Sequence, residues 1–597
     1  MTPLPFSSAS RRRIAAMVAA TLVGAAVQAC GHSSDATAPV TEQVCGAGGV
    51  VTVPALGAAT LDCSSGGTMV QLAGNGATYL VVPQFAAGNV SKAAIAYTIG
   101  AANTVAASVQ AQRSAPSESG VGVASSPETF ARMARSNSLQ MRFDASLRLA
   151  ERAAVSSGRW NFFGSASGSF SRSIRRSVQP GGLPAPGSLR DFRVISSLDP
   201  NNPNFVTVSA RLLYTGANIL IYIDTLAPAN GFSTDQLNGF GQLFDQTLYA
   251  IDVAAFGPPS DIDGNSRLIV LLSPTVNSLT PAAQCASQGF IAGFFDGFDL
   301  SSTSTNSNQG EIYFGLVPDP GATVSCTHSV SSLLNIAPAT FLHELQHLIN
   351  FSQHAIARGG AGEEGWLDEG LSLVAEELGS IYYEQRFPPP SGRTNPNQLF
   401  PDSSQGFING LLFDSYKYLL KTDTTTVTLH SDADGGLNWR GGDWLLLRWL
   451  GDQKGANFYK LLEQSSLTGT RNIAAAAGES FQSLFGDFSL SLYTDSIVGV
   501  AKSSIPARDR FNSRTLRRMY QALFNAAGPS ADVPRAFPIV TTPLTGTISA
   551  SMVPGTMSFY TLTAPASSAT ITVRFKAAGG GALPAGMHPQ LSVFRLP

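Results

Sequence analysis

Two histidines and a glutamate in one short segment have the types and the spacing that bind a metal ion and activate water. The segment APATFLHELQHLIN contains His343, Glu344 and His347. On an α-helix, residues four positions apart differ by about 40° in direction, so both imidazoles project from one face and can share an ion. Glu344 could then take a proton from a zinc-activated water. Large apolar neighbours indicate that this helix is buried: Phe341, Leu342, Leu345, Leu348 and Ile349.

A catalytic zinc site needs a third protein ligand and keeps one position open. The metzincin pattern would require glycine at position 350 and histidine at 353, but the chain has Asn350 and Gln353, with His354 out of register. We therefore predict that the third ligand is a carboxylate. Glu369 stands in WLDEGLSLVAEEL, 22 positions after His347, on an apolar helix where a buried carboxylate needs a cation as its partner.

Other carboxylates close to Glu369 in the sequence receive different roles. Glu376 lies seven residues further along the same face, and we predict that it orients a ligand or replaces Glu369 as the ligand. Asp368 is a candidate for the same two roles. Glu363 and Glu364, in the glycine-rich approach to this helix, are poorer candidates. If the helix returns antiparallel to the histidine helix, the Glu369 carboxylate is expected within about 5 Å of both imidazoles.

The order of these segments resembles a known clan of peptidases. HELQHLI followed by WLDEGLS is similar to the gluzincins, the clan of thermolysin and the membrane aminopeptidases, and most of all to the hyicolysin-type secreted peptidases. The likeness covers roughly residues 195–500. It implies an α+β fold with a zincin-like catalytic domain, in which a mixed sheet and an active-site helix precede a helical lobe that carries the third ligand. It also implies endopeptidase activity with one Zn²⁺ ion.

The group that stabilises the oxyanion is harder to assign. Gluzincins usually use a tyrosine or histidine, and relatives often have tyrosine before the helix that corresponds to GGDWLLLRWL. This chain has Trp439 and Arg440 at that place. Tyr416 and His430 are therefore candidates for oxyanion donor, and simple packing is the alternative role for the tyrosine.

The N-terminus has the pattern of an export signal. Arg11, Arg12 and Arg13 precede the uncharged, mostly apolar run Ile14–Ala29, which is short for a membrane span. The run ends in VQACG, which resembles a bacterial lipobox whose Cys30 becomes lipidated. We predict a lipoprotein-type signal peptide over residues 1–30 and a tether over 31–44, and therefore a cell-envelope or extracellular protein that touches membrane only through its lipid.

The other four cysteines form an even set. Sequence order and spacing favour the pairs Cys45–Cys63 and Cys285–Cys326, although three pairings are formally possible. Disulfides persist in oxidising compartments, so this prediction agrees with export.

Composition and patterning divide the rest of the chain. We predict a small β domain at 45–112, an arginine-rich helical segment and linker at 113–192, a zinc peptidase domain at 193–530 and a β-sandwich-like accessory module at 537–597. The catalytic domain is thus expected between small all-β modules. The arginine-rich segment could touch anionic lipid or cover the active site as a pro-segment, but a solvated helical spacer is the favoured interpretation.

Asp261-Ile262-Asp263-Gly264-Asn265 is similar to part of a calcium-binding loop, because alternating carboxylates suit hard cations. No glutamate follows at the twelfth position of such a loop, where Leu271 or Leu272 stands. A polar turn before the apolar segment RLIVLLS is therefore favoured, and Ca²⁺ remains an alternative.

These features together favour a zinc endopeptidase that acts on proteins or peptides as a monomer. The net charge of −2 excludes a global field that would attract nucleic acid. The alternative is a catalytically silent surface-binding lipoprotein built on a peptidase fold. A zinc aminopeptidase is less favoured, because the sequence has no recognisable clamp for an N-terminal amine.

Overall fold

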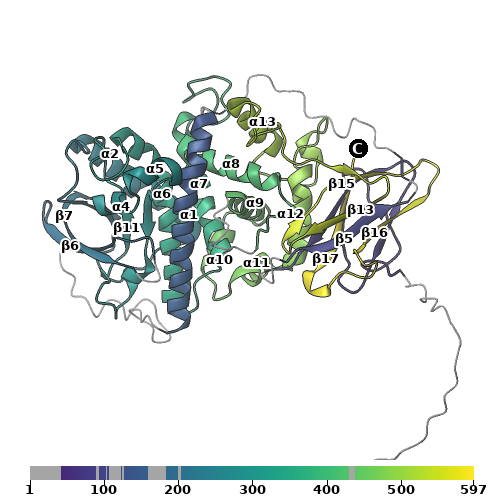
Figure 1. The fold of residues 1–597 in the computed structure, drawn as a ribbon, viewed down its shortest axis with the longest axis horizontal. Helices are drawn as coiled ribbons and strands as arrows, with labels where there is room; N and C mark the ends of the chain where they lie inside the picture. Colours follow the sequence, from purple (N-terminus) through teal and green to yellow (C-terminus); the bar gives the residue numbers. More distant parts are fainter. Residues whose placement is uncertain are drawn as a thin grey trace, which may run out of the picture. The chain divides into compact units, whose positions relative to one another are not determined.

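The computed structural model describes residues 42–88, 93–102, 104–105, 123, 127–158, 183–199, 203–428 and 437–597 (Figure 1). Residues from Glu42 onward form one compact unit. The predictions for the signal peptide, for Cys30 and for His430 lie outside the described residues. None of the helices within the described ranges has the length and apolar character needed to cross a membrane.

Helices and strands both contribute substantially, in agreement with the predicted α+β class. The helices are α1 (Pro127–Ser156), α2 (Thr234–Gln242), α3 (Tyr249–Phe256), α4 (Pro274–Ser278), α5 (Ala282–Gln288), α6 (Val330–Phe351), α7 (Gly365–Arg386), α8 (Gln405–Leu419), α9 (Leu437–Lys454), α10 (Phe458–Glu463), α11 (Gly469–Ala477), α12 (Phe481–Thr494) and α13 (Leu516–Ala527).

Six strands form a mixed sheet beside α6. They are β6 (Leu189–Ile195), β7 (Phe205–Thr215), β8 (Ile219–Asp224), β9 (Leu268–Leu272), β10 (Gly293–Phe295) and β11 (Ile312–Gly315), in the order β10-β11-β9-β8-β7-β6. β9 is parallel to both β8 and β11, and the other pairs are antiparallel. All five residues of β9, LIVLL, are buried, as expected for a strand covered on both faces.

Helices α6 and α7 pack closely against each other and form the centre of the fold. The side chain of Ser329 caps the start of α6 by accepting a hydrogen bond from the Ser332 N–H. A Cβ at Gly379 of α7 would lie 2.7 Å from Leu342 Cδ1 of α6 and 2.6 Å from Phe407 Cδ1 of α8, so a larger residue there would force these side chains to shift. The two helices can therefore present polar side chains to one another at short range.

The strands at the two ends of the chain belong to one β-sandwich. Its first sheet has the order β1-β3-β16-β5-β13 and its second the order β12-β15-β4-β17-β2, with β14 also paired to β4. The bounds are β1 (Val50–Val51), β2 (Ala58–Asp62), β3 (Met69–Ala73), β4 (Thr78–Phe85), β5 (Ile95–Ala101), β12 (Thr542–Pro543), β13 (Thr547–Met552), β14 (Thr556–Met557), β15 (Tyr560–Thr563), β16 (Thr570–Ala577) and β17 (Pro589–Arg595).

This pairing corrects the expectation of two separate β modules. β4 is bonded on one side by β15 and on the other by β17, so Val81 faces both Tyr560 and Val593. Figure 1 shows the purple N-terminal strands and the yellow C-terminal strands together in this part of the molecule. Each segment alone would leave long strand edges unpaired, which is unfavourable, and combining them satisfies those edges.

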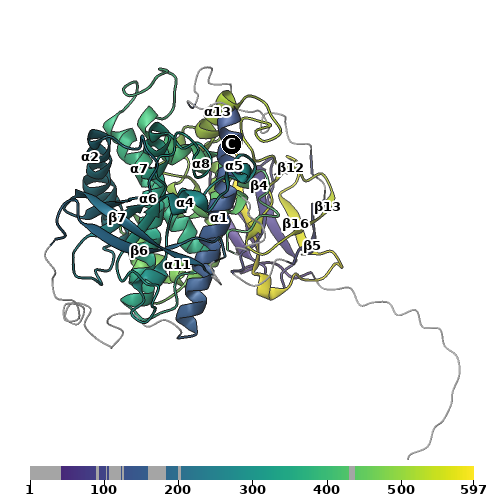
Figure 2. The same ribbon diagram turned by 60° about the vertical axis from the view of Figure 1, so that its left-hand side comes forward.

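The long helix α1 is not a solvated spacer, so that part of the prediction is wrong. α1 packs against α7, α8 and α9, and it runs along this helical region in both views (Figures 1 and 2). Phe143 and Leu147 are buried beside the mixed sheet, and the charged side chains of Asp144, Arg148 and Glu151 are also buried. A helix that buries three charges must place them beside partners.

Both predicted cysteine pairs are disulfides. The Cα atoms of Cys45 and Cys63 are 4.5 Å apart, and those of Cys285 and Cys326 are 6.0 Å apart. The first disulfide lies in the core of the β-sandwich, and the second connects α5 to the loop before α6.

Candidate metal centre

Helices α6 and α7 bring two imidazoles and one carboxylate together. The Nε2 atoms of His343 and His347 lie 3.2 Å apart. Each is 3.6 Å from an oxygen of Glu369, with one carboxylate oxygen facing each imidazole. All three side chains are buried, and their ligand atoms are close enough to surround a single ion. The structure thus places Glu369 where a third ligand is expected, well within the predicted 5 Å.

The Glu369 carboxylate is the strongest sign that a cation belongs at this place. The residue is fully buried, and neither of its oxygens has a hydrogen-bond partner among the described residues. Its nearest cationic atom is Nη1 of Arg440, at 4.0 Å. An ionised carboxylate without hydrogen bonds is costly to bury, whereas a divalent cation between it and the imidazoles would compensate it. Two nitrogen donors and one carboxylate form a set that suits zinc.

The two histidines are held with Nε2 toward Glu369. His343 Nδ1 lies 2.8 Å from Glu376 Oε1, and His347 Nδ1 lies 3.0 Å from Asp368 Oδ1. Such carboxylate partners fix the ring orientation and the tautomer of metal-binding histidines. Burial lowers the pKa of His343 to about 3 and that of His347 well below its usual value, so both imidazoles are neutral, the form that binds metals.

Glu344 also lies close to His343, with one carboxylate oxygen within 4.8 Å of a ring nitrogen. Its Oε2 accepts a hydrogen bond of 2.9 Å from the Phe295 N–H, on strand β10. Its Oε1 is buried and has no hydrogen-bond partner within the described part of the chain. Burial, and then the Asp144 carboxylate, raise the pKa of Glu344 well above its usual range. One oxygen is therefore fixed in place and the other is free to accept a proton.

These side chains open into a cleft of about 1060 Å³. Residues of the centre that line it are His343, Glu344 and Glu376, and it extends along α6, α8 and the loop before α6. The volume is at the upper end of the range for small-molecule pockets, which leaves space for several residues of a peptide.

Sequence analysis did not identify the residues that α1 contributes. One carboxylate oxygen of Asp144 lies within 4.8 Å of a ring nitrogen of His343 and of a carboxylate oxygen of Glu344. Arg148 donates hydrogen bonds to Glu151 Oε1 and to the Phe295 carbonyl, at 2.9 and 2.6 Å. The sequence does show three charges at helical spacing among apolar residues, but not which helix they contact.

Arg440, on α9, is a second residue whose position the sequence did not predict. It lines the cleft, and its Nη2 is 3.6 Å from Glu376 Oε1. Burial lowers the pKa of Arg440, but Glu369 and Glu376 outweigh that effect and raise it above its usual value. The guanidinium is therefore a fixed positive charge beside the candidate metal ligands.

The structure does not support Tyr416 as oxyanion donor. Its hydroxyl donates a hydrogen bond to the Arg535 carbonyl at 2.5 Å and accepts one from the Arg535 N–H at 3.1 Å. Its ring packs edge-on against Tyr520, and it is not among the residues that line the cleft. Packing, the alternative role, fits these contacts. His430 lies outside the described residues.

The poorer carboxylate candidates are occupied elsewhere. Glu363 accepts hydrogen bonds from the Gly469 N–H and from Asn472 Nδ2, at 2.6 and 2.8 Å. Glu364 accepts one from Trp366 Nε1 at 2.9 Å. His354 has its Nε2 3.9 Å from Glu363 and contributes nothing to the centre.

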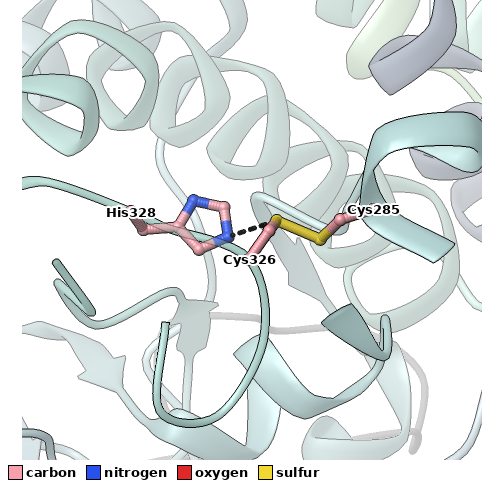
Figure 3. Close-up of side chains that lie close together, drawn as sticks. All are labelled: Cys285, Cys326 and His328. Atoms are coloured by element: carbon pink, nitrogen blue, oxygen red, sulfur yellow. Dashed lines mark hydrogen bonds between the residues drawn. A yellow bond between two sulfur atoms is a disulfide. The ribbon is translucent and has the colours of Figure 1, made fainter. Parts of the chain in front are cut away.

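The second disulfide lies at the wall of the cleft. Figure 3 shows Cys285 and Cys326 joined through their sulfur atoms, with His328 Nε2 3.4 Å from Cys326 Sγ. All three residues line the cleft. They are close enough to bind a metal ion, but with both sulfurs in a disulfide no thiolate is available, so this cluster shapes the cleft wall.

Taken together, two neutral imidazoles, a buried carboxylate and a free glutamate oxygen form the side-chain set of a metal-dependent hydrolase. No family model matches the chain. It is similar to the neutral metalloprotease ShpI of Staphylococcus hyicus, with 23% identity over 193 residues. This match covers 32% of the chain and 40% of that relative, which is less than half of either protein. The similarity suggests a metallopeptidase.

Proposed function

We propose that this protein is a zinc-dependent endopeptidase of the gluzincin clan, most similar to the hyicolysin-type peptidases. The observation that supports this most strongly is the buried Glu369 carboxylate, which has no hydrogen bond and faces two neutral imidazoles. The proposed catalytic domain comprises residues 193–530 together with α1. The alternative of a catalytically silent binding lipoprotein is not favoured by the similarity to a metalloprotease.

In this proposal His343, His347 and Glu369 hold the ion, while Glu376 and Asp368 keep the two imidazoles oriented. A bound Zn²⁺ supplies Lewis acidity and lowers the pKa of water. Glu344 Oε1 accepts the proton of the attacking water and afterwards delivers it to the leaving amine. The hydrogen bond from Phe295 to Oε2 keeps the carboxylate from rotating away during these transfers.

Arg440 is our candidate for the group that stabilises the oxyanion. It is positively charged, it lines the cleft, and it lies on the same side of the centre as Glu376. Donors aimed at developing negative charge contribute strongly when they are held in place in a site that excludes water. This role would replace the tyrosine or histidine that the gluzincins usually use.

Arg440→Lys is expected to retain zinc and to lower kcat by about 10²–10³-fold, the usual effect of losing an oxyanion donor. Lysine keeps the positive charge near Glu369 and Glu376, so the fold should survive. Metal content and steady-state kinetics on a peptide substrate test this. Arg211→Lys, at an exposed position of β7, is the control. A change confined to KM would assign Arg440 to substrate binding instead.

Glu376→Gln is expected to weaken zinc affinity by about 10–100-fold, the typical effect of removing the partner of a metal-binding histidine. The amide can still accept a hydrogen bond from His343 Nδ1, but as a neutral group it no longer raises the basicity of the ring as a carboxylate does. Competition with a chromogenic zinc chelator measures the affinity. An unchanged affinity would mean that Glu376 serves only in packing.

The remaining functional proposals concern substrates and location. The cleft suits an extended peptide, so the proposed substrates are proteins or peptides. The two disulfides support export from the cytoplasm, because such bonds persist in oxidising compartments. Export as a lipoprotein, anchored at Cys30, and a monomeric state complete the proposal.

Casein hydrolysis by the purified chain tests the proposed function. We expect activity that a chelator abolishes and that stoichiometric Zn²⁺ restores. A preparation with one bound zinc ion and no hydrolysis of casein or of a peptide library would contradict the peptidase proposal.

A further inference from the structure

Three carboxylates meet at the starts of two neighbouring strands of the mixed sheet, and none of them belongs to the candidate zinc centre. Asp261 and Asp263 belong to the loop that leads into β9, and Glu311 directly precedes β11. One oxygen from each carboxylate lies within 4.8 Å of the others. β9 and β11 are neighbouring parallel strands, so the sheet itself brings together residues that are about 50 positions apart in the sequence.

Glu311 supplies the carboxylate that the sequence pattern lacks. A calcium loop of this type ends in a glutamate at its twelfth position, where this chain has leucine. Glu311 instead comes from the next strand, and its Oε1 accepts hydrogen bonds from Ser260 Oγ at 2.6 Å and from the Ile262 N–H at 2.9 Å. It is therefore bonded to the loop that carries both aspartates.

The second oxygen of Glu311 has no hydrogen-bond partner in the described part of the chain. Glu311 is only 2% exposed, and its Oε2 makes no hydrogen bond within the described ranges. Burial raises the pKa of this carboxyl to about 7, and the two nearby aspartates act in the same direction. Among the described residues, no lysine, arginine or histidine forms an ion pair with any of the three. Arg267, the nearest arginine in the sequence, instead donates to the Gly216 and Asn265 carbonyls.

We propose that Asp261, Asp263 and Glu311 bind a calcium ion. Calcium–oxygen bonds of about 2.3–2.6 Å place ligand oxygens up to roughly 5 Å apart, which agrees with the spacing of this cluster. Three carboxylates from protein suit Ca²⁺ better than Mg²⁺, which usually retains several waters and binds through one or two carboxylates. Calcium would also compensate three carboxylates that have no ion-pair partner among the described residues.

The position of the cluster gives the ion a structural role. Ser260 Oγ, which donates to Glu311, lies 2.9 Å from Ser352 Oγ, and Ser352 directly follows α6. Calcium would thus hold together the starts of β9 and β11 and the C-terminal end of the helix that carries His343 and His347. This effect on stability does not depend on whether the protein is a peptidase.

Calorimetric titration with CaCl₂ tests the proposal. The full chain is freed of calcium on a chelating resin and reloaded with one equivalent of Zn²⁺. We expect one saturable calcium site and a rise in Tm of at least about 3 °C at saturating calcium. Asp263→Asn and Glu311→Gln should abolish both effects, while Asp191→Asn, at an exposed position of β6 in the same sheet, should leave them unchanged.

Three outcomes would overturn the calcium site. The first is that the wild-type protein shows no saturable calcium binding. The second is that Asp263→Asn binds calcium as tightly as the wild type does. The third is that Mg²⁺ alone raises the Tm of the wild type as much as calcium does. If Glu311→Gln does not fold, Asp261→Asn replaces it, because Asp261 is only partly buried and, among the described residues, its carboxylate accepts hydrogen bonds only from Ser266. Loss of calcium binding in a folded Asp261→Asn variant supports the proposal, and retention at wild-type affinity contradicts it.

Discussion

Glu344→Gln is expected to keep its zinc and its fold and to lose hydrolytic activity by at least about 10²–10⁴-fold. Glutamine has nearly the same shape and can still accept the hydrogen bond that Phe295 donates. Its amide cannot take a proton from water, so only the transfer step is lost. Zinc content by atomic absorption, circular dichroism and hydrolysis of a fluorogenic peptide together measure the three properties.

The matched control for this change is Glu364→Gln. Glu364 stands at the start of α7, outside the centre, and its hydrogen bond from Trp366 can be retained by an amide oxygen. The control should have wild-type activity. If Glu344→Gln kept activity within a few-fold of wild type, a different base would have to be found, and Asp144, with an oxygen within 4.8 Å of Glu344, would be the first candidate.

Glu369→Gln is expected to lose zinc binding almost completely. Removing a residue that only supports a metal ligand costs about 10–100-fold in affinity, and removing a ligand itself should cost more. Zinc should also cease to stabilise the fold, whereas at a thousand times its Kd it adds about 4 kcal/mol to the wild type. Thermal unfolding with and without added Zn²⁺ measures this difference.

The same titration on Glu364→Gln separates ligand loss from a general effect on α7. That control should retain the zinc-dependent rise in Tm. Tight zinc binding by Glu369→Gln would transfer the ligand role to Glu376, whose carboxylate is already 2.8 Å from His343 Nδ1. If both variants lost zinc binding, the cause would be that removing a charge from α7 disturbs the packing of this helix.

The parts of the centre that lie on one helix could be predicted from sequence, because helix geometry is local. His343 and His347 converge through a four-residue spacing, and Glu369 follows on the next helix after a short connection. Asp144 and Arg440 reach the centre from positions about 200 residues before and about 100 residues after His343. Nothing in their local sequence indicates which distant helix they will contact.

The loop that carries Asp261 and Asp263 is a second example of distant residues whose meeting the sequence does not predict. Its two aspartates are visible in the sequence, but the third carboxylate is supplied by parallel pairing of β9 and β11. The β-sandwich is the largest case, because strand propensity identified its strands but not which segment would pair with which. Packing of α1 was likewise missed, since its apolar face is interrupted by the charged residues that it buries.

The mutual pairing of the chain ends has a consequence for biosynthesis. Val81 of β4 is paired with Tyr560 and Val593, so the neighbours of this strand are made almost 500 residues later. At a synthesis rate of about 5–20 residues per second, roughly 25–100 s pass between the synthesis of β4 and that of its two neighbours. During that interval its apolar edges are open to other chains. β4 therefore cannot complete its sheet until β15 and β17 have been synthesised, even though the helices of the centre precede both strands in the chain.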